Sequence, residues 1–423
     1  GDWINLRNEG FVDLIPLAPE KKFDAKSQSG FIVNGPAIAS GRDVWVYNFS
    51  KNDLGKNMGN MIAFYNQQRE GYQTALKENP ELKVEEFIDT DAHKISWTRA
   101  LRNAARNGKK YDFNAENIAM SLYRPFCIQY LYFDEDFIES PGLSRKLFPT
   151  PQIDNLVICL SCKGSAKEFS VMISNVLPDY HFVGDTNIFP LYWYEEKDYS
   201  KDSKDMFSLS SEDKYVSHDG ISDWMLKEVR NRLGNTRSIT RETIFYYIYG
   251  LLHSQEYRST FATDLKKSLP CIPIVEDYSV FMDFYYAGKM LADLHLNYEN
   301  IEAYPDVSVT DNYTGTDEYD HYAVQKMVFP SKKKRSSIIY NKYIRIDNIP
   351  EQAYDYVVNG KSAIEWVMER YAVTVNKASL IKNDPNEWSR EHHQPRYILD
   401  LLLSIINVSC QTVDIVNRLP KLK

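Results

Sequence analysis

The sequence predicts an α+β fold, with a mixed-sheet N-terminal lobe and a mainly helical C-terminal lobe that carries a few strands. Short apolar and aromatic runs bounded by turn signals, typical of strands, dominate the first part, and apolar residues at spacings of three and four, typical of helices, dominate the second. A polar, serine-rich stretch separates them. We therefore expect an N-terminal lobe over residues 1–196, a linker or loop over 197–220 and a C-terminal lobe over 221–423.

The composition is that of a globular protein. The chain has 423 residues, of which 43% are hydrophobic and 13% aromatic, so it is long and apolar enough to build a large core. The formal net charge of −8 argues against a protein coated in positive charge. It does not exclude DNA binding, because binding depends on where the positive charge lies on the surface.

Targeting signals and metal motifs are weak in this sequence. No apolar run reaches the roughly 20 residues that a membrane span requires, and the first residues do not form a basic-then-apolar leader. We therefore expect a cytoplasmic location.

The pair Cys159-x-x-Cys162 has no second pair beside it, which favours buried reduced thiols over a zinc or redox centre. The sequence predicts neither a metal ion nor a cofactor.

The first elements are a strand and a long helix. Residues 41–50 carry strand-forming side chains on both faces, which predicts a buried strand with Arg42 at its mouth. Residues 52–79 place Met58 and Met61 on one helical face, and Asn79-Pro80 predicts the end of that helix.

The most basic segment of the chain follows. Its cations are Lys94, Arg99, Arg102, Arg106, Lys109, Lys110 and Arg124, against only Asp112 and Glu116. A helix that starts near Ser96 would place its three arginines on one face and turn Trp97 and Leu101 inward. Two interpretations stay open. The arginines form a solvated helix face, or they hold DNA phosphates in contacts that salt weakens.

Residues 126–189 predict a mixed sheet, because three strand-like runs are bounded by glycine and proline turns. One pattern in this region resembles a catalytic signature. Asp179, Glu195 and Lys197 loosely match the spacing of a PD-(D/E)xK nuclease, whose carboxylates bind Mg²⁺. The charged run that follows Glu195 is typical of a surface loop, which disfavours the nuclease interpretation.

The C-terminal lobe is predicted to open with three helices, over residues 240–253, 254–269 and 280–294. His253 and His295 within them are interpreted as packed histidines, since their spacing forms no metal site. Strands are expected within 324–346, and the turn between two of them carries Lys332, Lys333, Lys334 and Arg335. This turn is either a clamp on the DNA backbone or a solubilising loop.

The stretch 349–371 contains Gly360-Lys361-Ser362, which matches the end of a phosphate-binding loop. The glycine that such a loop requires five residues earlier is Asp355 here, so we expect a structural role. Asn359-Gly360 is predicted to close a short helix that Pro350 opens. Ser362 is predicted to cap the next helix, with Glu365 completing a capping box. The apolar stripe of that helix is Ile364, Val367, Met368 and Tyr371.

Several short sequence words, taken in order, resemble one known family. These words are 42–50 RDVWVYNFS, 122–126 LYRPF, 189–192 FPLY, 244–253 IFYYIYGLLH, 291–295 LADLH, 383–388 NDPNEW and 395–402 PRYILDLL. Together they resemble the C-terminal specificity region of type ISP restriction-modification enzymes, in which a nuclease, a DNA translocase, an adenine methyltransferase and a target recognition domain share one chain. The family pattern carries an arginine where this chain has Cys271, which leaves the role of that arginine in doubt here.

The resemblance implies a non-catalytic region that recognises a specific sequence in double-stranded DNA. The methyltransferase and translocase domains of the same longer chain would be its partners, and we expect a monomer. Phosphates would be held by the cations of 94–124 and 332–335, while Arg42 is the first candidate to read a guanine. Two alternatives remain: a Mg²⁺-dependent nuclease that uses Asp179 and Glu195, and a structural coupling module that does not bind DNA.

Overall fold

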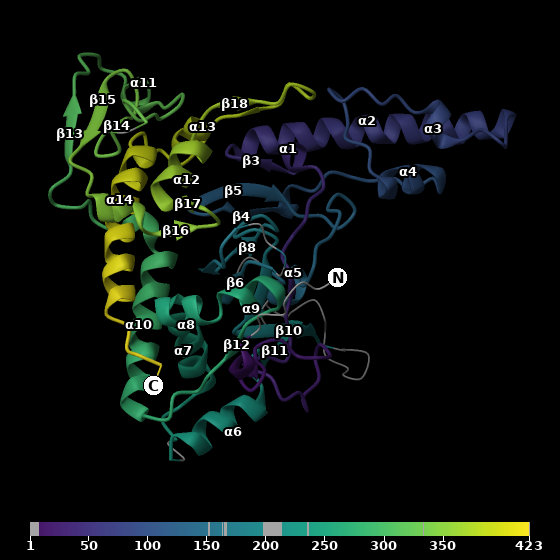
Figure 1. Cartoon of the computed structure of the whole chain (residues 1–423). Helices are drawn as coiled ribbons and strands as arrows, with labels where there is room; N and C mark the ends of the chain where they lie inside the picture. The colour runs from purple at the N-terminus through teal and green to yellow at the C-terminus, as the bar shows by residue number, and fades with distance from the viewer. Residues whose placement is uncertain are drawn as a thin grey trace, which may run out of the picture.

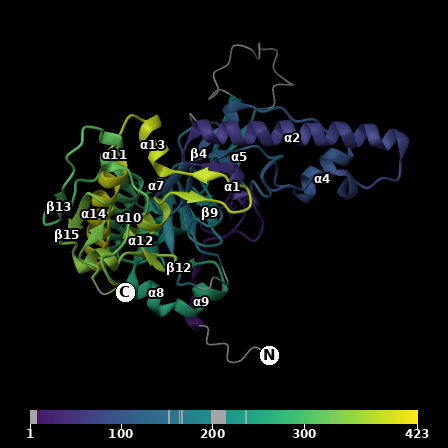
Figure 2. The same ribbon diagram turned by 90° about the horizontal axis from the view of Figure 1, so that it is seen from above.

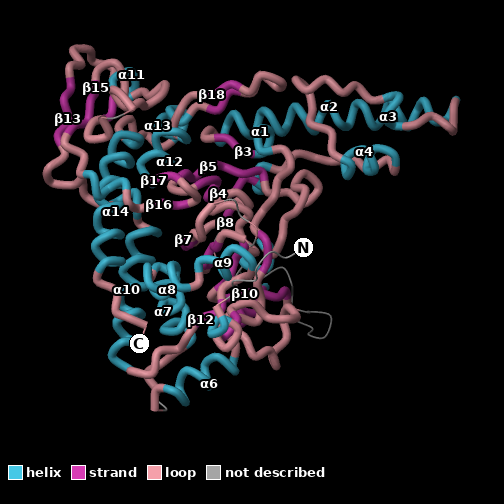
Figure 3. The backbone as a smooth tube through the Cα atoms, in the orientation of Figure 1, coloured by secondary structure: helices cyan, strands magenta, loops and turns pink. Residues whose placement is uncertain are grey.

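The computed structural model describes residues 8–150, 153–162, 164, 167–197, 214–234, 237–332 and 334–422. It confirms the α+β prediction (Figures 1 and 3). One four-stranded sheet has the order β2-β9-β6-β7, and its strands are Gly35–Pro36, Asn187–Pro190, Val157–Leu160 and Val171–Ser174. The other has the order β3-β5-β4-β8, with strands Tyr47–Asn48, Cys127–Tyr132, Ile118–Arg124 and Leu177–Pro178. The second sheet is mixed, because β4 and β8 run parallel.

Five smaller sheets complete the strand content of the described residues. Four are two-stranded: β1 with β12 (Ile15–Pro16, Cys271–Ile272), β10 with β11 (Tyr192–Glu196, Tyr215–Asp219), β16 with β17 (Val357–Val358, Lys361–Ser362) and β18 with β19 (Thr374–Val375, Lys382–Asn383). The fifth has the order β13-β15-β14, with strands Ser308–Asp311, Ile344–Asp347 and Ile338–Ile339. β11 falls within the predicted linker, and residues 198–213 of that linker lie outside the described part of the chain.

The predicted helix over 52–79 is confirmed as α2, Lys51–Glu78. Ser50 begins it by accepting a hydrogen bond from the Asp53 N–H, and the chain leaves the helix just before Pro80. Two short helices, α3 (Val84–Phe87) and α4 (Arg99–Arg106), pack along it. We call α2, α3 and α4 the arm, because they project together from the body in both views (Figures 1 and 2).

The predicted strand over 41–50 is largely wrong. Only Tyr47–Asn48 pairs as a strand, and Asp43–Val46 forms the short helix α1. Gly41 adopts a positive φ of 67°, and the Ser40 hydroxyl donates to the Asp43 carboxylate, so the chain turns before it can extend. The alternation of large side chains, on which the strand prediction rested, contains no information about these two local effects.

The C-terminal lobe contains most of the helices. They are α6 (Asp223–Arg232), α7 (Arg241–His253), α8 (Gln255–Thr260), α9 (Ala262–Lys267), α10 (Tyr278–Leu296), α11 (Glu318–Tyr322), α12 (Ala363–Arg370), α13 (Pro385–Glu391) and α14 (Tyr397–Asn417), while α5 (Ser144–Leu147) lies in the first lobe. The helix expected over 254–269 is divided into α8 and α9 at Phe261. The helices expected over 240–253 and 280–294 are confirmed as α7 and α10.

The stretch 349–371 is partly as predicted. Ser362 and Glu365 form the expected capping box of α12. Pro350 precedes a short 3₁₀ helix, Glu351–Tyr354, but Asn359-Gly360 does not end that helix. With φ values of 48° and 78°, these two residues form the two-residue turn of the β16–β17 hairpin. The left-handed conformation was predicted correctly and its location in the fold was not.

The helix α14 is long and apolar enough to cross a membrane by length and composition, but 67% of its apolar window is buried inside the protein. It packs against α10 and α12, so it is a core helix of the C-terminal lobe. The two predicted lobes also share one core. Val33 and Val157 from the first lobe belong to the same buried cluster as Ile364 and Leu402 from the second.

Candidate nucleic-acid interface

The arm presents the predicted basic helix face. Thr98 caps α4 by accepting a hydrogen bond from the Leu101 N–H. Leu101 and Ala105 are buried against α2, so the opposite face of α4 is left to the cations. Arg99 and Arg106 are exposed on that face and Arg102 is half-buried. The helix starts at Arg99 rather than near Ser96, which leaves Trp97 outside it.

Most cations of the basic segment 94–124 lie beside carboxylates. The nitrogen–oxygen distances are 3.2 Å for Arg106–Glu85, 2.7 Å for Lys94–Asp89, 2.7 Å for Lys109–Asp136 and 3.0 Å for Lys110–Asp112. These pairs are exposed to solvent, so they are weak and a phosphate can displace the carboxylate. Among the described residues, Arg99 and Arg102 have no carboxylate at ion-pair distance. They are therefore the cations of this segment that no carboxylate neutralises.

The second predicted basic site lies far from the first. Lys332 and Lys334 are exposed on the loop before β14, whereas Lys333 lies outside the described residues. Arg335 pairs with Glu365 and stands 5.1 Å from the ring centre of Tyr354. In both views β13–β15 and α4 occupy opposite ends of the molecule (Figures 1 and 2). The structure therefore does not bring the two basic segments together.

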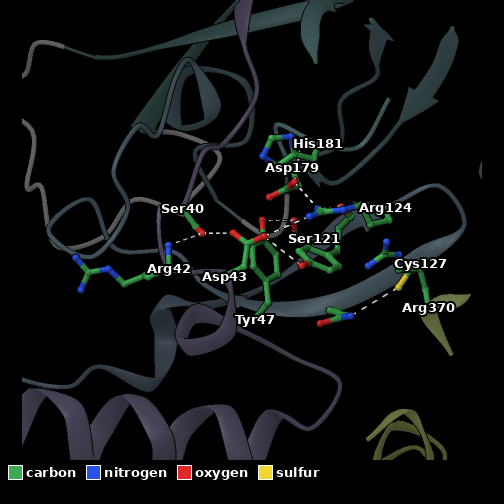
Figure 4. A network of polar contacts seen from close by, with 12 residues as sticks. Ser40, Arg42, Asp43, Tyr47, Ser121, Arg124, Cys127, Asp179, His181 and Arg370 are labelled. Carbon is green, nitrogen blue, oxygen red and sulfur yellow. Dashed lines mark hydrogen bonds and ion pairs between the residues drawn. The ribbon is translucent and has the colours of Figure 1, made fainter. Parts of the chain in front are cut away.

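Arg124 lies in the interior, which argues against its predicted contact with phosphate. Its Nη1 donates to Asp179 Oδ1 at 2.6 Å, and its Nη2 donates to Asp43 Oδ2 at 3.3 Å (Figure 4). Asp179 is only 1% exposed, and burial raises its pKa to about 6 despite the guanidinium beside it. The Asp43 carboxylate also accepts a hydrogen bond from the Tyr123 hydroxyl. Arg124 therefore joins β4 to α1 and to the end of β8.

Arg42 is also buried, with 5% of its surface exposed. Its side chain points away from Arg124 (Figure 4), and its Nη2 donates to Thr98 Oγ1 at 2.7 Å. Burial lowers the pKa of the guanidinium to about 10. Since Thr98 caps α4, Arg42 connects the start of α1 to the root of the basic helix. In this structure it is not placed at a surface where it can reach a base.

The carboxylates of the loose nuclease pattern have different surroundings. Asp179 is engaged by Arg124, whereas Glu195 is an exposed residue of β10 that stands 3.5 Å from His218. The described residues contain no group of three His, Cys, Asp or Glu side chains that could hold a metal ion. This geometry gives the nuclease interpretation no support.

Sequence reasoning missed one feature near the root of the arm, the hairpin β18–β19 with its tip. Figure 2 shows its two strands beside α2. A groove of about 500 Å³ separates the two elements. Its lining residues are Trp45, Asp53, Asn57, Asn60, Phe64, His93, Lys94, Ser379, Leu380, Ile381 and Lys382. The sequence signal for this hairpin is the turn-forming pair Asn376 and Ser379.

Comparison with known proteins decides the family. Residues 29–401 match the family model described as the Type ISP C-terminal specificity domain. This chain belongs to that family. The resemblance to Type ISP specificity domains that the sequence words predicted is therefore confirmed over most of the chain. A search of curated proteins gave no match.

Solved structures support the assignment to the Type ISP specificity domain. The chain is 35% identical to the Type ISP restriction-modification enzyme LlaGI, in a nuclease-deletion mutant in complex with a DNA substrate mimic, with a TM-score of 0.82 over 99% of this chain. It is 36% identical to the ATP-dependent Type ISP enzyme LlaBIII bound to DNA, with a TM-score of 0.84 over 100%. For DrdV in a DNA complex the identity is 27% and the TM-score 0.82 over 99%. The chain spans 35%, 25% and 39% of these three proteins.

Proposed function

We propose that this Type ISP specificity domain recognises a specific sequence in double-stranded DNA, as part of a longer restriction-modification enzyme. One observation carries the proposal: the whole chain matches part of LlaGI and LlaBIII, both solved with DNA or a DNA mimic, at 35% and 36% identity. Methyltransferase and translocase domains of the same polypeptide would act on the DNA that this part selects.

The surface chemistry of the basic segment 94–110 supports this function. Arg99 and Arg102 offer guanidinium groups that fit phosphate oxygens, and the exposed pairs of Lys94 and Lys109 can exchange their carboxylates for phosphates. Lys332 and Lys334 offer two further cations at the other end. Phosphate contacts position the protein on the duplex without reading its sequence, so base recognition requires other side chains.

We further propose that the chain itself is non-catalytic, monomeric and cytoplasmic. Incubation of the purified chain with plasmid and Mg²⁺ should give no cleavage, and light scattering should give the mass of one chain. Cleavage that Asp179→Asn abolishes, in a variant shown to be folded, would favour the nuclease instead.

Selection from a random duplex library tests the main proposal directly. The chain should enrich one consensus sequence, and affinity for it should fall as salt rises because phosphate contacts release counterions. Enrichment of no sequence, with equal affinity for all duplexes, would contradict the assignment of specificity to this chain. Binding to no duplex at low salt would favour the structural coupling module.

The arm is tested by replacing Arg99, Arg102 and Arg106 with alanine together. If all three hold phosphates, the slope of log affinity against log salt should decrease by about three, and affinity should fall for every sequence alike. The control replaces Arg232, Arg237 and Arg418, which are exposed in the C-terminal lobe. Circular dichroism should show both variants folded. An unchanged slope in the arm variant would reject α4 as a contact surface.

A further inference from the structure

The hairpin β18–β19 combines exposed apolar side chains with a rigid base. Val375 and Leu380 are 55% and 62% exposed, among the highest values for large apolar residues in the described chain. Leu380 also has a φ of +57°, a backbone conformation that a leucine rarely adopts. Exposed apolar surface and local strain both cost stability, and they are typical of positions kept for binding.

The tip of this hairpin is ordered by its own hydrogen bonds. Asn376 Oδ1 accepts from the N–H groups of Ala378 and Ser379 and from the Ser379 hydroxyl, at 2.9 to 3.1 Å. The Asn376 N–H donates to the Ile381 carbonyl, and the Leu380 N–H donates to the Asn376 carbonyl. These bonds hold the left-handed backbone at Leu380 in one conformation and keep its side chain out in solvent.

The base of the hairpin is anchored to the N-terminal lobe. Asn48 donates from Nδ2 to the Lys382 carbonyl at 3.1 Å, and the Phe49 N–H donates to Asn383 Oδ1 at 3.0 Å. Asn383 Nδ2 in turn donates to Gln129 Oε1 on β5. The hairpin is thus fixed at its base to the sheet that contains β5, while Val375, Lys377 and Leu380 are exposed to solvent.

Charge indicates what the hairpin meets. Residues 374–383 contain no carboxylate and two lysines, of which Lys382 pairs with Asp384 at 2.7 Å and Lys377 is exposed. Asn57 and Asn60 of α2 face the hairpin across the groove, and such amide side chains donate and accept hydrogen bonds as base edges do. A polyanion with apolar and hydrogen-bonding edges fits this surface better than another acidic protein surface does.

We propose that β18–β19 enters the major groove of duplex DNA as a two-stranded ribbon, with Leu380 and Val375 against base edges and Lys377 near the backbone. This inference rests on the proposed function and names the element that reads sequence. The major groove is wide enough for a two-stranded ribbon and exposes the thymine methyl group, the natural partner of an apolar side chain.

The test compares hairpin variants in the same library selection. Leu380→Asn removes the apolar contact and keeps a residue that tolerates positive φ, so it should remain folded. It should lose base preference at one or two positions and bind the wild-type consensus roughly five- to hundredfold more weakly. Lys377→Ala should instead weaken binding to all duplexes alike. The control is Val357→Thr, because Val357 is 44% exposed on the separate hairpin β16–β17.

Uracil in place of thymine at the affected position identifies the groove. It removes only a methyl group in the major groove, so it should weaken the wild-type chain and leave Leu380→Asn unchanged. An unaltered consensus for Leu380→Asn would overturn the proposal, as would a loss of assembly with the methyltransferase part without loss of base preference. If the wild-type chain selects no consensus, the proposed function itself fails. Failure of the hairpin proposal, in which the wild type and Leu380→Asn select the same consensus, is therefore distinguishable from failure of the proposed function.

Discussion

Arg124 was predicted to contact phosphate, but its neighbours in the structure give it an internal role. The side chain lies between Asp179 and Asp43, with little access to solvent. A buried ion pair adds little to stability relative to a well-packed apolar pair, but the loss of one member leaves the other charge buried and unpaired. The Arg124 guanidinium therefore compensates the charge of the two carboxylates in the interior and is not accessible to a ligand.

Arg124→Ala should lower the free energy of unfolding by about 3–5 kcal/mol, because Asp179 would be left buried without its partner. Urea denaturation followed by circular dichroism measures this. The control is Arg145→Ala, whose ion pair with Glu135 is exposed, and which should leave the midpoint almost unchanged. Equal midpoints for the two variants would show that the buried network does not hold β4 to α1.

His295 makes folding sensitive to pH. Its Nδ1 accepts from the Tyr249 hydroxyl at 2.7 Å, and its Nε2 donates to Thr412 Oγ1, whose own hydroxyl donates to the Val408 carbonyl. This arrangement fits the neutral ring. Burial lowers its pKa to about 3, with the charge of Arg258 contributing.

Since the pKa of His295 is lower in the folded state than in the unfolded chain, its contribution to stability is complete above about pH 6.5 and is lost as the pH falls toward 3. The loss approaches about 1.4 kcal/mol per pH unit in that window. His295→Gln should reduce the slope of unfolding free energy against pH by about one proton. A wild-type slope in the variant, measured between pH 6 and 4, would show that His295 is protonated in the folded protein.

The sequence predicted residue types better than residue surroundings. It correctly identified His253 and His295 as packed and α4 as basic. It did not separate the buried Arg42 and Arg124 from the exposed Arg99, because charge patterning along one segment carries no information about partners far away in the chain. Asp179 lies 55 positions from Arg124, and only the fold brings them together.

At the scale of elements, α7 and α10 pack backbone against backbone. A Cβ added at Gly288 would stand 1.9 Å from the Tyr246 carbonyl oxygen and 2.7 Å from the Gly250 nitrogen. Neither atom can rotate away as a side chain does. Glycine at this position therefore sets the distance between two helices that form the centre of the C-terminal lobe.

Gly288→Ala should destabilise the protein by about 1–3 kcal/mol even though alanine favours helix, because the two helices must separate. Gly59→Ala in α2 is the matched control, since nothing lies within 4 Å of its added Cβ. That variant should be more stable by about 0.5–1 kcal/mol. Thermal unfolding of both measures the difference, and two shifts in the same direction would contradict the account.

Helices were more predictable than short strands in this chain. α2, α7 and α10 carry their own caps and apolar periodicity, so they could be read locally. β16, β18 and their partners have two residues each, and their pairing depends on turns and on the sheet beside them. The hairpin β18–β19 was missed for this reason, although it forms one wall of the groove.

At the scale of the whole molecule, the net charge of −8 is combined with basic segments at two separate ends. One duplex contacts both ends only if it extends across the face between them. The distribution of charge, rather than its sum, decides whether an acidic chain binds DNA.

Comparison of two variants tests whether both ends meet the same duplex. Replacement of Lys332 and Lys334 by alanine should reduce the salt slope by about two, and combination with the triple arginine variant of α4 should reduce it by about five. The salt slope is measured for each variant on duplexes of increasing length. If the variant of Lys332 and Lys334 has the wild-type slope on every length, the DNA contacts only the arm.

The Glu391 carboxylate is a late-made cap on an early-made helix. It accepts hydrogen bonds from the Ser50 hydroxyl and from the N–H groups of Lys51 and Asn52, at 2.7 to 3.1 Å, so a residue 340 positions later covers the start of α2. During synthesis the ribosome releases α2 long before this carboxylate exists. Until then the first turn of α2 depends on its local cap, Ser50, and the contact to Glu391 forms only after the C-terminal residues have been made.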